Sequence, residues 1–301
     1  MKFFSALISV FTGIALAYAG YGVYSLVWSL LIASFLASMV FFVIGIVKLP
    51  VNFRFRFQET KAFLRIGLYQ TGSQVLNYFS REIDILIVGK ILGTEILGLY
   101  SLAKQLVQKP ILILNPILTK ITAPLLAKLQ DNQRIIKNTY LKIISLVALV
   151  NFPVYSLLAF MAFHVVSLFY GQKYIDAALI VSFLSINYAF RSIGNPVGGL
   201  IIARGRTDIG FYWNLFVFAV YPIVVYFSSI QGVYFLAASL AAFRVILSYP
   251  GWYMVLRKLI SVGYVEYLSH YYLPLITSVV SGVVAYYIVN YLKISSDLLQ
   301  Q

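Results

Sequence analysis

Basic side chains occur inside long apolar stretches of this sequence, where a charge is costly and therefore informative. They are Arg81, Lys104, Lys109, Lys120, Arg191 and Arg244, and the acidic residues Glu82 and Asp84 stand among them. A charge at the centre of a bilayer costs about 2.5–3.5 kcal/mol on insertion scales. We therefore expect these cations to pair with acids or to line a watery cavity. Lys120, near the end of its stretch, can instead snorkel to the interface.

Polar side chains in three of these stretches recur at helical spacing. One set, Gln70, Ser73, Gln74, Asn77, Arg81 and Asp84, falls on one face of a helix because its members are three or four residues apart. The next stretch repeats the pattern with Ser101, Lys104, Gln105, Gln108 and Lys109, and a later one with Asn187, Arg191 and Asn195. Three polar faces with an excess of cations predict a cavity that receives an anion.

Candidate substrate-binding residues follow from these faces. They are Gln70, Asn77, Arg81, Asp84, Lys104, Gln105, Lys109, Arg191 and Asn195. Structural alternatives stay open: Arg81 and Asp84 could simply pair, and Arg244, alone on its stretch, is undecided. Lys104 has no acidic residue within reach on its own helix, which favours a functional role. We predict no catalytic residue, metal or cofactor, since the sequence has no cysteine and only two histidines.

Membrane-spanning helices must carry these residues. The 301-residue chain is 61% hydrophobic and 11% charged with a mean hydropathy of +0.88, whereas soluble domains are about 45–50% apolar and about 25% charged. At about 20 residues per span we expect about nine spans. They are 3–19, 23–47, 66–90, 95–127, 140–163, 175–203, 208–228, 232–256 and 271–292. The stretches lack the alternation of β-barrel strands, so the sequence predicts an all-α integral membrane protein.

Basic residues in the connections predict the orientation. Alternate connections, 48–65, 128–142, 204–206 and 257–258, are rich in Lys and Arg, whereas those between them carry only Lys173. The basic side is therefore cytoplasmic, and we expect a multi-pass protein of the inner membrane, in contact with membrane lipids. The net charge of +14 is mainly this topology signal. Nucleic-acid binding is not expected, because no basic soluble segment carries it.

Two features of the apolar stretches have alternative readings. Ala17-Tyr18-Ala19 also fits a signal-peptide cleavage site, although a single preceding lysine and a closely following span favour a retained helix. Helix breakers stand at Pro110, Pro116 and Pro124 and in Gly194-Asn195-Pro196. Broken helices at mid-membrane are typical of transporter sites and hinges, whereas small residues can also simply allow close packing.

Residues 66–104 carry a recognisable pattern. It reads Ser73, Asn77-Tyr78, Ser80-Arg81, Asp84, Gly89-Lys90, Gly93, Leu97-Gly98, Tyr100-Ser101 and Ala103. Later pieces are Pro124 with Leu129-Gln130-Asp131, Phe152-Pro153, Leu168-Phe169-Tyr170-Gly171 and Gly205-Arg206-Thr207-Asp208. In these positions the chain resembles the polysaccharide/O-antigen flippases of the multidrug/oligosaccharidyl-lipid/polysaccharide exporter superfamily, and among them the colanic-acid-exporter-like branch.

The resemblance implies two six-helix lobes around a central cavity. Residues 1–47 would be the last two helices of the N-terminal lobe, 48–65 a cytoplasmic inter-lobe linker, 66–256 the complete C-terminal lobe, and 257–301 an extra helix and tail. The first helices of the N-terminal lobe have no counterpart here. We therefore expect this chain to need a partner segment that supplies them.

The function implied by the resemblance is flipping of undecaprenyl-diphosphate-linked oligosaccharide for O-antigen, capsule or exopolysaccharide synthesis. One alternative is a cation-coupled multidrug exporter of the same superfamily, which would need acidic cavity residues where only Glu82 and Asp84 qualify. Another is a membrane glycan polymerase or ligase, which would need a long outer loop with catalytic groups. The predicted outer connections are short, so we do not expect an enzyme.

Overall fold

The computed structural model describes residues 2–48, 57–129 and 132–298. All regular structure in these ranges is helical, without a β-strand, which confirms the predicted all-α class. The chain divides into two compact units, Met1–Thr60 and Lys61–Gln301, which are described separately. Part of the predicted linker (49–56, with Arg54 and Arg56), Gln130, Asp131 and the last three residues lie outside the described ranges.

The first unit is a helical hairpin. Helices α1 (Lys2–Tyr18) and α2 (Tyr24–Lys48) pack against each other. Gly20 and Gly22 make the turn with positive φ of 87° and 51°, which glycine adopts without steric cost. Ser25 and Ser29 are buried, while most large apolar side chains of α2 are exposed, as lipid-facing residues are. The predicted spans 3–19 and 23–47 are confirmed as helices.

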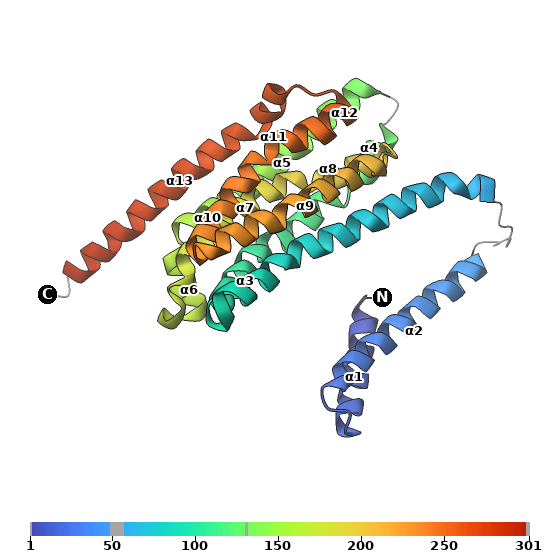
Figure 1. Ribbon diagram of the computed structural model, residues 1–301, viewed down its shortest axis with the longest axis horizontal. Helices are drawn as coiled ribbons and strands as arrows, with labels where there is room; N and C mark the ends of the chain where they lie inside the picture. Colours follow the sequence, from blue (N-terminus) through green and yellow to red (C-terminus); the bar gives the residue numbers. More distant parts are fainter. Residues whose placement is uncertain (1, 49–56, 130–131, 299–301) are drawn as a thin grey trace. The chain divides into compact units, whose positions relative to one another are not determined.

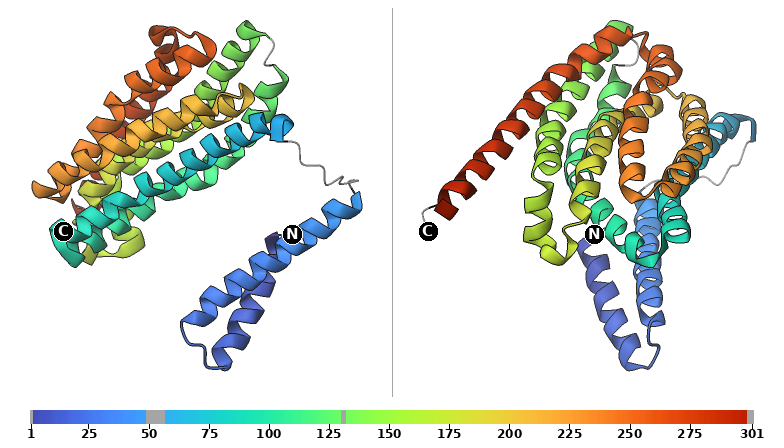
Figure 2. Two further views of the ribbon diagram at one scale, coloured as in Figure 1. Left: turned by 45° about the vertical axis from the view of Figure 1, so that its right-hand side comes forward. Right: turned by 60° about the vertical axis from the view of Figure 1, so that its left-hand side comes forward.

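Helix α3 (Phe57–Thr119) folds back on itself at Gly93 and holds two predicted spans, 66–90 and 95–127. Its halves run side by side (Figures 1 and 2). Gly93 has φ 83° and ψ 175°, a backbone region that is essentially restricted to glycine. Residues 57–65, predicted as the end of the linker, are instead the first turns of this helix. The second half continues through Pro110 and Pro116.

Two spans have ends or interruptions that the sequence analysis placed differently. The span 95–127 is broken after Thr119, and Thr122–Lys128 forms a separate helix α4 with Pro124 in its first turn, where proline is tolerated. Helix α5 (Gln133–Phe160) begins seven residues before the predicted 140, because the Asn132 side chain caps it by accepting hydrogen bonds from the backbone N–H groups of Arg134 and Ile135. The remainder of that predicted span belongs to α6 (Ala162–Tyr170).

The predicted break in the span 175–203 is present. After the short η1 (Gln172–Tyr174), α7 (Ala177–Gly194) ends and α8 (Pro196–Ala203) begins around Asn195. Pro196 is the first residue of α8, where its missing N–H costs nothing. The following segments are α9 (Thr207–Ile230), α10 (Val233–Ile246), α11 (Ser248–Gly251), the π-helical η2 (Trp252–Leu256), α12 (Arg257–Ile260) and α13 (Tyr264–Leu298).

The helices are long and apolar enough for a multi-pass membrane protein. Seven helical stretches qualify by length and hydropathy, and Ala6–Tyr18 is a shorter apolar helix. One of the seven, Phe63–Pro116, contains the turn at Gly93 and so consists of two apolar helical halves. Among the described residues, seven stretches thus qualify where the sequence predicted about nine spans: Phe63–Pro116 holds two of the predicted spans, and the predicted span 3–19 is a shorter helix.

The core of the second unit lies around α5 and α7, with α13 against α5 and α10 against α7. Tyr140, Phe152 and Tyr155 of α5 are fully buried there. Polar side chains join neighbouring helices: the Asn187 amide donates to the Leu240 carbonyl (2.6 Å) and the Ser182 hydroxyl to the Ala159 carbonyl (2.8 Å). Such bonds hold membrane helices together where burial from water cannot.

Candidate functional site

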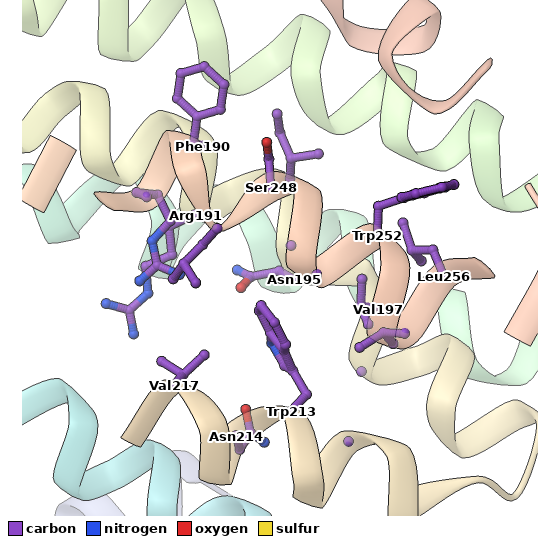
Figure 3. Close-up of a pocket in the computed structure, with 18 of the residues that line it drawn as sticks. Phe190, Arg191, Asn195, Val197, Trp213, Asn214, Val217, Ser248, Trp252 and Leu256 are labelled. Atoms are coloured by element: carbon purple, nitrogen blue, oxygen red, sulfur yellow. The ribbon is translucent and has the colours of Figure 1, made fainter. Parts of the chain in front are cut away.

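A pocket of about 330 Å³ opens within the second unit. Its walls come from the first half of α3, from α7 and α8 on either side of Asn195, from α9, from α10 to η2, and from α13. Figure 3 shows these elements surrounding it. The break between α7 and α8 therefore lies in the wall of this pocket.

Four of the predicted substrate-binding residues line this pocket: Asn77, Arg81, Arg191 and Asn195. They come from two of the three polar faces that the sequence analysis singled out. Gln70, Gln105 and Lys109 do not line it; Gln105 and Lys109 are exposed, and Gln70 is half-buried. A role for these three in substrate binding stays a prediction.

Three arginines dominate the charge of the pocket. Arg81 enters from α3, Arg191 from the last turn of α7, and Arg244 from the last turn of α10. The Arg191 guanidinium lies 5.4 Å from the centre of the Tyr188 ring, and the buried Arg244 Nε has no hydrogen-bond partner among the described residues. Arg244, which the sequence left undecided, thus lines the pocket together with Arg81 and Arg191.

The described residues that line the pocket include no acid, and none of the three arginines forms an ion pair within the described part of the chain. Each guanidinium stays charged under all ordinary conditions. Uncompensated positive charge among membrane helices is costly, and an anionic ligand would relieve that cost with charge-assisted hydrogen bonds. The arrangement is therefore suited to binding an anion.

Aromatic and amide side chains form the remainder of the pocket. Figure 3 shows Trp213 extending from α9 towards Asn195, with Asn214 next to it on the same helix. A Cβ on Gly251 would lie 3.3 Å from the Trp213 ring, so the absence of a side chain at Gly251 avoids a tight contact with the indole. The side-chain amides of Asn195 and Asn214 make no hydrogen bond to other described residues, and so can serve a ligand.

Trp252 is the second indole of the pocket and is held more firmly. Its Nε1 donates to the Val262 carbonyl (2.9 Å), and its ring lies 5.6 Å from that of Tyr249 and 5.2 Å from that of Tyr264. The sequence analysis missed both tryptophans. Two of only three tryptophans in the chain fall on neighbouring predicted spans, and that signal could have found them.

Residues 1–179 match the model of a family described as polysaccharide biosynthesis protein. The chain belongs to this family. The match extends from α1 into α7, so it includes Asn77 and Arg81, whereas Arg191, Trp213 and Arg244 lie beyond it.

Curated relatives have related names. The chain is 29% identical over 224 residues to the lipopolysaccharide biosynthesis protein WzxC of Escherichia coli K12. The aligned residues make up 74% of this chain and 46% of the relative. It is 28% identical over 234 residues to the teichuronic acid biosynthesis protein TuaB of Bacillus subtilis 168, with 78% and 48% covered. It is 28% identical to the amylovoran biosynthesis protein AmsL of Erwinia amylovora, and that alignment covers 68% of this chain and 53% of the relative.

The chain therefore spans about half the length of the curated relatives it matches. No solved structure matches it.

Two predicted site residues of this polysaccharide biosynthesis protein, Asp84 and Lys104, form a buried ion pair. Only 2% of Asp84 and 4% of Lys104 are exposed, and Lys104 Nζ lies 2.8 Å from Asp84 Oδ1. Glu82 Oε2 is 3.7 Å from the same ammonium. Neither Asp84 nor Lys104 lines the pocket.

This pair corrects two expectations. Asp84 pairs with Lys104, and the described structure has no ion pair between Asp84 and Arg81, so the alternative in which those two neighbours pair is wrong. Lys104 has an acidic partner after all. The sequence argument considered only residues on the same helix, whereas the turn at Gly93 brings the two halves of α3 together.

Proposed function

We propose that this chain takes part in flipping lipid-linked oligosaccharides across the inner membrane during synthesis of a surface polysaccharide such as O-antigen, capsule or exopolysaccharide. The family description and the names of the relatives, which refer to lipopolysaccharide, teichuronic acid and amylovoran biosynthesis, support this process. The many apolar helices suit a transporter for a lipid substrate.

The observation that carries the proposal is the group of three arginines in a pocket whose described lining has no acid. An oligosaccharide under assembly on a membrane is attached to a polyprenyl diphosphate, whose charge must pass the bilayer. Guanidinium groups bind phosphate oxygens in pairs of parallel hydrogen bonds. Arg81, Arg191 and Arg244 would thus replace the water that the diphosphate leaves behind.

The size and the other walls of the pocket agree with this ligand. Its volume of about 330 Å³ is at the lower end of the range for small-molecule sites, about 300–1,000 Å³. Such a pocket suits a diphosphate with an adjoining sugar better than a whole oligosaccharide. The Trp213 indole offers an apolar face to a sugar ring, while the Asn195 and Asn214 amides offer hydrogen bonds to its hydroxyl groups.

The whole transport cycle would require more than this chain. Residues 66–256 would form the C-terminal lobe, 1–47 two helices of the N-terminal lobe, 48–65 the linker, and 257–301 an extra helix and tail. A partner segment would supply the facing helices, and the lobes would alternate access around the bound head group. The process needs no covalent step and no cofactor, so the chain would act as a transporter and not as an enzyme.

Binding of a soluble analogue tests the proposal. The full 301-residue chain in detergent should bind farnesyl diphosphate and not farnesol, because only the former has the anion. Arg81→Ala and Arg244→Ala should each weaken binding by about tenfold or more, as expected for loss of a charge-assisted hydrogen bond of about 1.5–3 kcal/mol. The measurement is a titration by microscale thermophoresis.

The control is Lys142→Ala, which removes an exposed positive charge on α5 away from the pocket. It should leave the affinity unchanged. Equal binding of farnesol and farnesyl diphosphate, or unchanged affinity in both arginine variants, would exclude the pocket as a diphosphate site.

A cation-coupled multidrug exporter is less well supported. A pocket for cationic drugs needs carboxylates, and the two acids near this site are held by Lys104 instead of facing the pocket.

A further inference from the structure

We infer that the buried Asp84–Lys104 pair, together with Tyr100, positions two residues that line the pocket. These two residues are Arg81 and Tyr221, through which the pair and Tyr100 influence binding of the anion. The inference rests on the proposed function, because it assigns these residues to recognition of the same ligand. None of the three positioning residues lines the pocket, so none of them would touch the ligand.

Lys104 connects the pair to Arg81. Its ammonium donates one hydrogen bond to Asp84 Oδ1 (2.8 Å) and another to the backbone carbonyl oxygen of Arg81 (2.5 Å). The second bond reaches across from the other half of α3. It fixes the main chain at the residue from which the Arg81 guanidinium enters the pocket, where Arg81 itself has no side-chain ion pair among the described residues.

Asp84 connects the pair to α9. Its Oδ2 accepts hydrogen bonds from the hydroxyl of Tyr100 (2.7 Å) and, more weakly, from that of Tyr221 (3.4 Å). Tyr221 lies on α9 and lines the pocket. One carboxylate therefore ties together both halves of α3 and the helix that carries Trp213.

Stability alone is a poor explanation for this arrangement. A buried ion pair can often be replaced by well-packed neutral residues without loss of stability, whereas removal of one partner leaves a buried charge uncompensated. The pair here contacts two residues that line the pocket, Arg81 on α3 and Tyr221 on α9, and its charges fix the position of both. That geometry predicts a defect in binding even where stability is restored.

The decisive variant is the double substitution Asp84→Asn with Lys104→Met, which removes both charges at similar side-chain size. Each single change should lower the melting temperature because it leaves the other charge buried and unpaired. The double variant should recover most of the melting temperature, yet bind farnesyl diphosphate about tenfold more weakly. Adding Arg81→Ala should cause little further loss, because residues that act through one another are not additive.

Tyr100→Phe tests the same inference without disturbing the charges. It removes one hydrogen bond to Asp84 from a fully buried side chain, and should weaken binding of farnesyl diphosphate severalfold. Combined with Arg81→Ala, it should again cause little further loss of affinity. The control is Ser182→Ala, which removes the hydrogen bond from Ser182 to the Ala159 carbonyl (2.8 Å) between two residues that do not line the pocket. It should leave the affinity unchanged.

Normal affinity in a folded double variant would overturn the inference, and so would normal affinity in Tyr100→Phe. A loss in either variant that simply adds to that of Arg81→Ala would also overturn it, because the residues would then act independently. Failure of the proposed function is a separate result, in which Arg81→Ala and Arg244→Ala both bind farnesyl diphosphate normally or farnesol binds equally well.

Discussion

At the scale of single residues, the pocket combines two kinds of recognition. The arginines supply charge in a described lining that has no acid, whereas Trp213 with Asn195 and Asn214 supplies an apolar face and free amides. The contributions of these two groups to affinity can be measured separately with ligands that have or lack a sugar. A change at the indole should affect a sugar and leave an unsubstituted diphosphate largely unaffected.

Trp213→Leu tests that separation. It should reduce affinity for a polyprenyl diphosphate that carries one sugar by about fivefold to tenfold, because a stacked aromatic contact contributes about 0.5–1.5 kcal/mol beyond its buried area. Affinity for farnesyl diphosphate should change by less than about twofold. Trp28→Leu, at a half-exposed indole on α2, is the matched control. An equal loss for both ligands would place Trp213 in the diphosphate site itself.

At the scale of elements, the fold-back of α3 decides which residues meet. Gly93 makes this turn, and the pairing of Asp84 with Lys104 depends on it. No heavy atom lies within 4 Å of a Cβ added at Gly93, so its backbone conformation alone requires glycine.

Gly93→Ala should therefore destabilise the protein by about 1–3 kcal/mol, the usual cost of such a backbone conformation for a residue with a side chain. Gly98→Ala is the control: it also has open space around its Cβ, but it lies within α3 in ordinary helical conformation, where alanine is favoured. Thermal unfolding in detergent compares the two. Equal melting temperatures would mean that the turn tolerates a side chain.

At the scale of the whole molecule, the distribution of Lys and Arg predicts the orientation. Single cysteines can test it because the chain has none of its own. Cysteines at Gln172 and Gln231, both exposed, should react with an impermeant maleimide in intact cells. A cysteine at exposed Asn138 should react only after permeabilisation. Ser229, at first sight an equivalent outer position, is fully buried and unsuitable. Labelling of Asn138 from outside would reverse the orientation.

The sequence by itself determined the all-α membrane class and the positions of the long apolar helices. These features depend on local composition: an apolar run of sufficient length must be a helix in a bilayer, because its backbone groups have no other partners there. It also placed Arg81 and Asn77 on one helix face and found the break at Asn195, since helical periodicity and proline act within a few residues.

Only the tertiary structure decided which faces meet. Arg244 is alone on its own helix, yet it shares a pocket with Arg81 and Arg191 from two others. Lys104, predicted to lack a partner, finds Asp84 across the turn at Gly93. The physical reason is that side-chain periodicity fixes a residue's direction only relative to its own helix axis. The packing of one helix against another, which fixes the remaining geometry, depends on contacts between residues far apart in the chain.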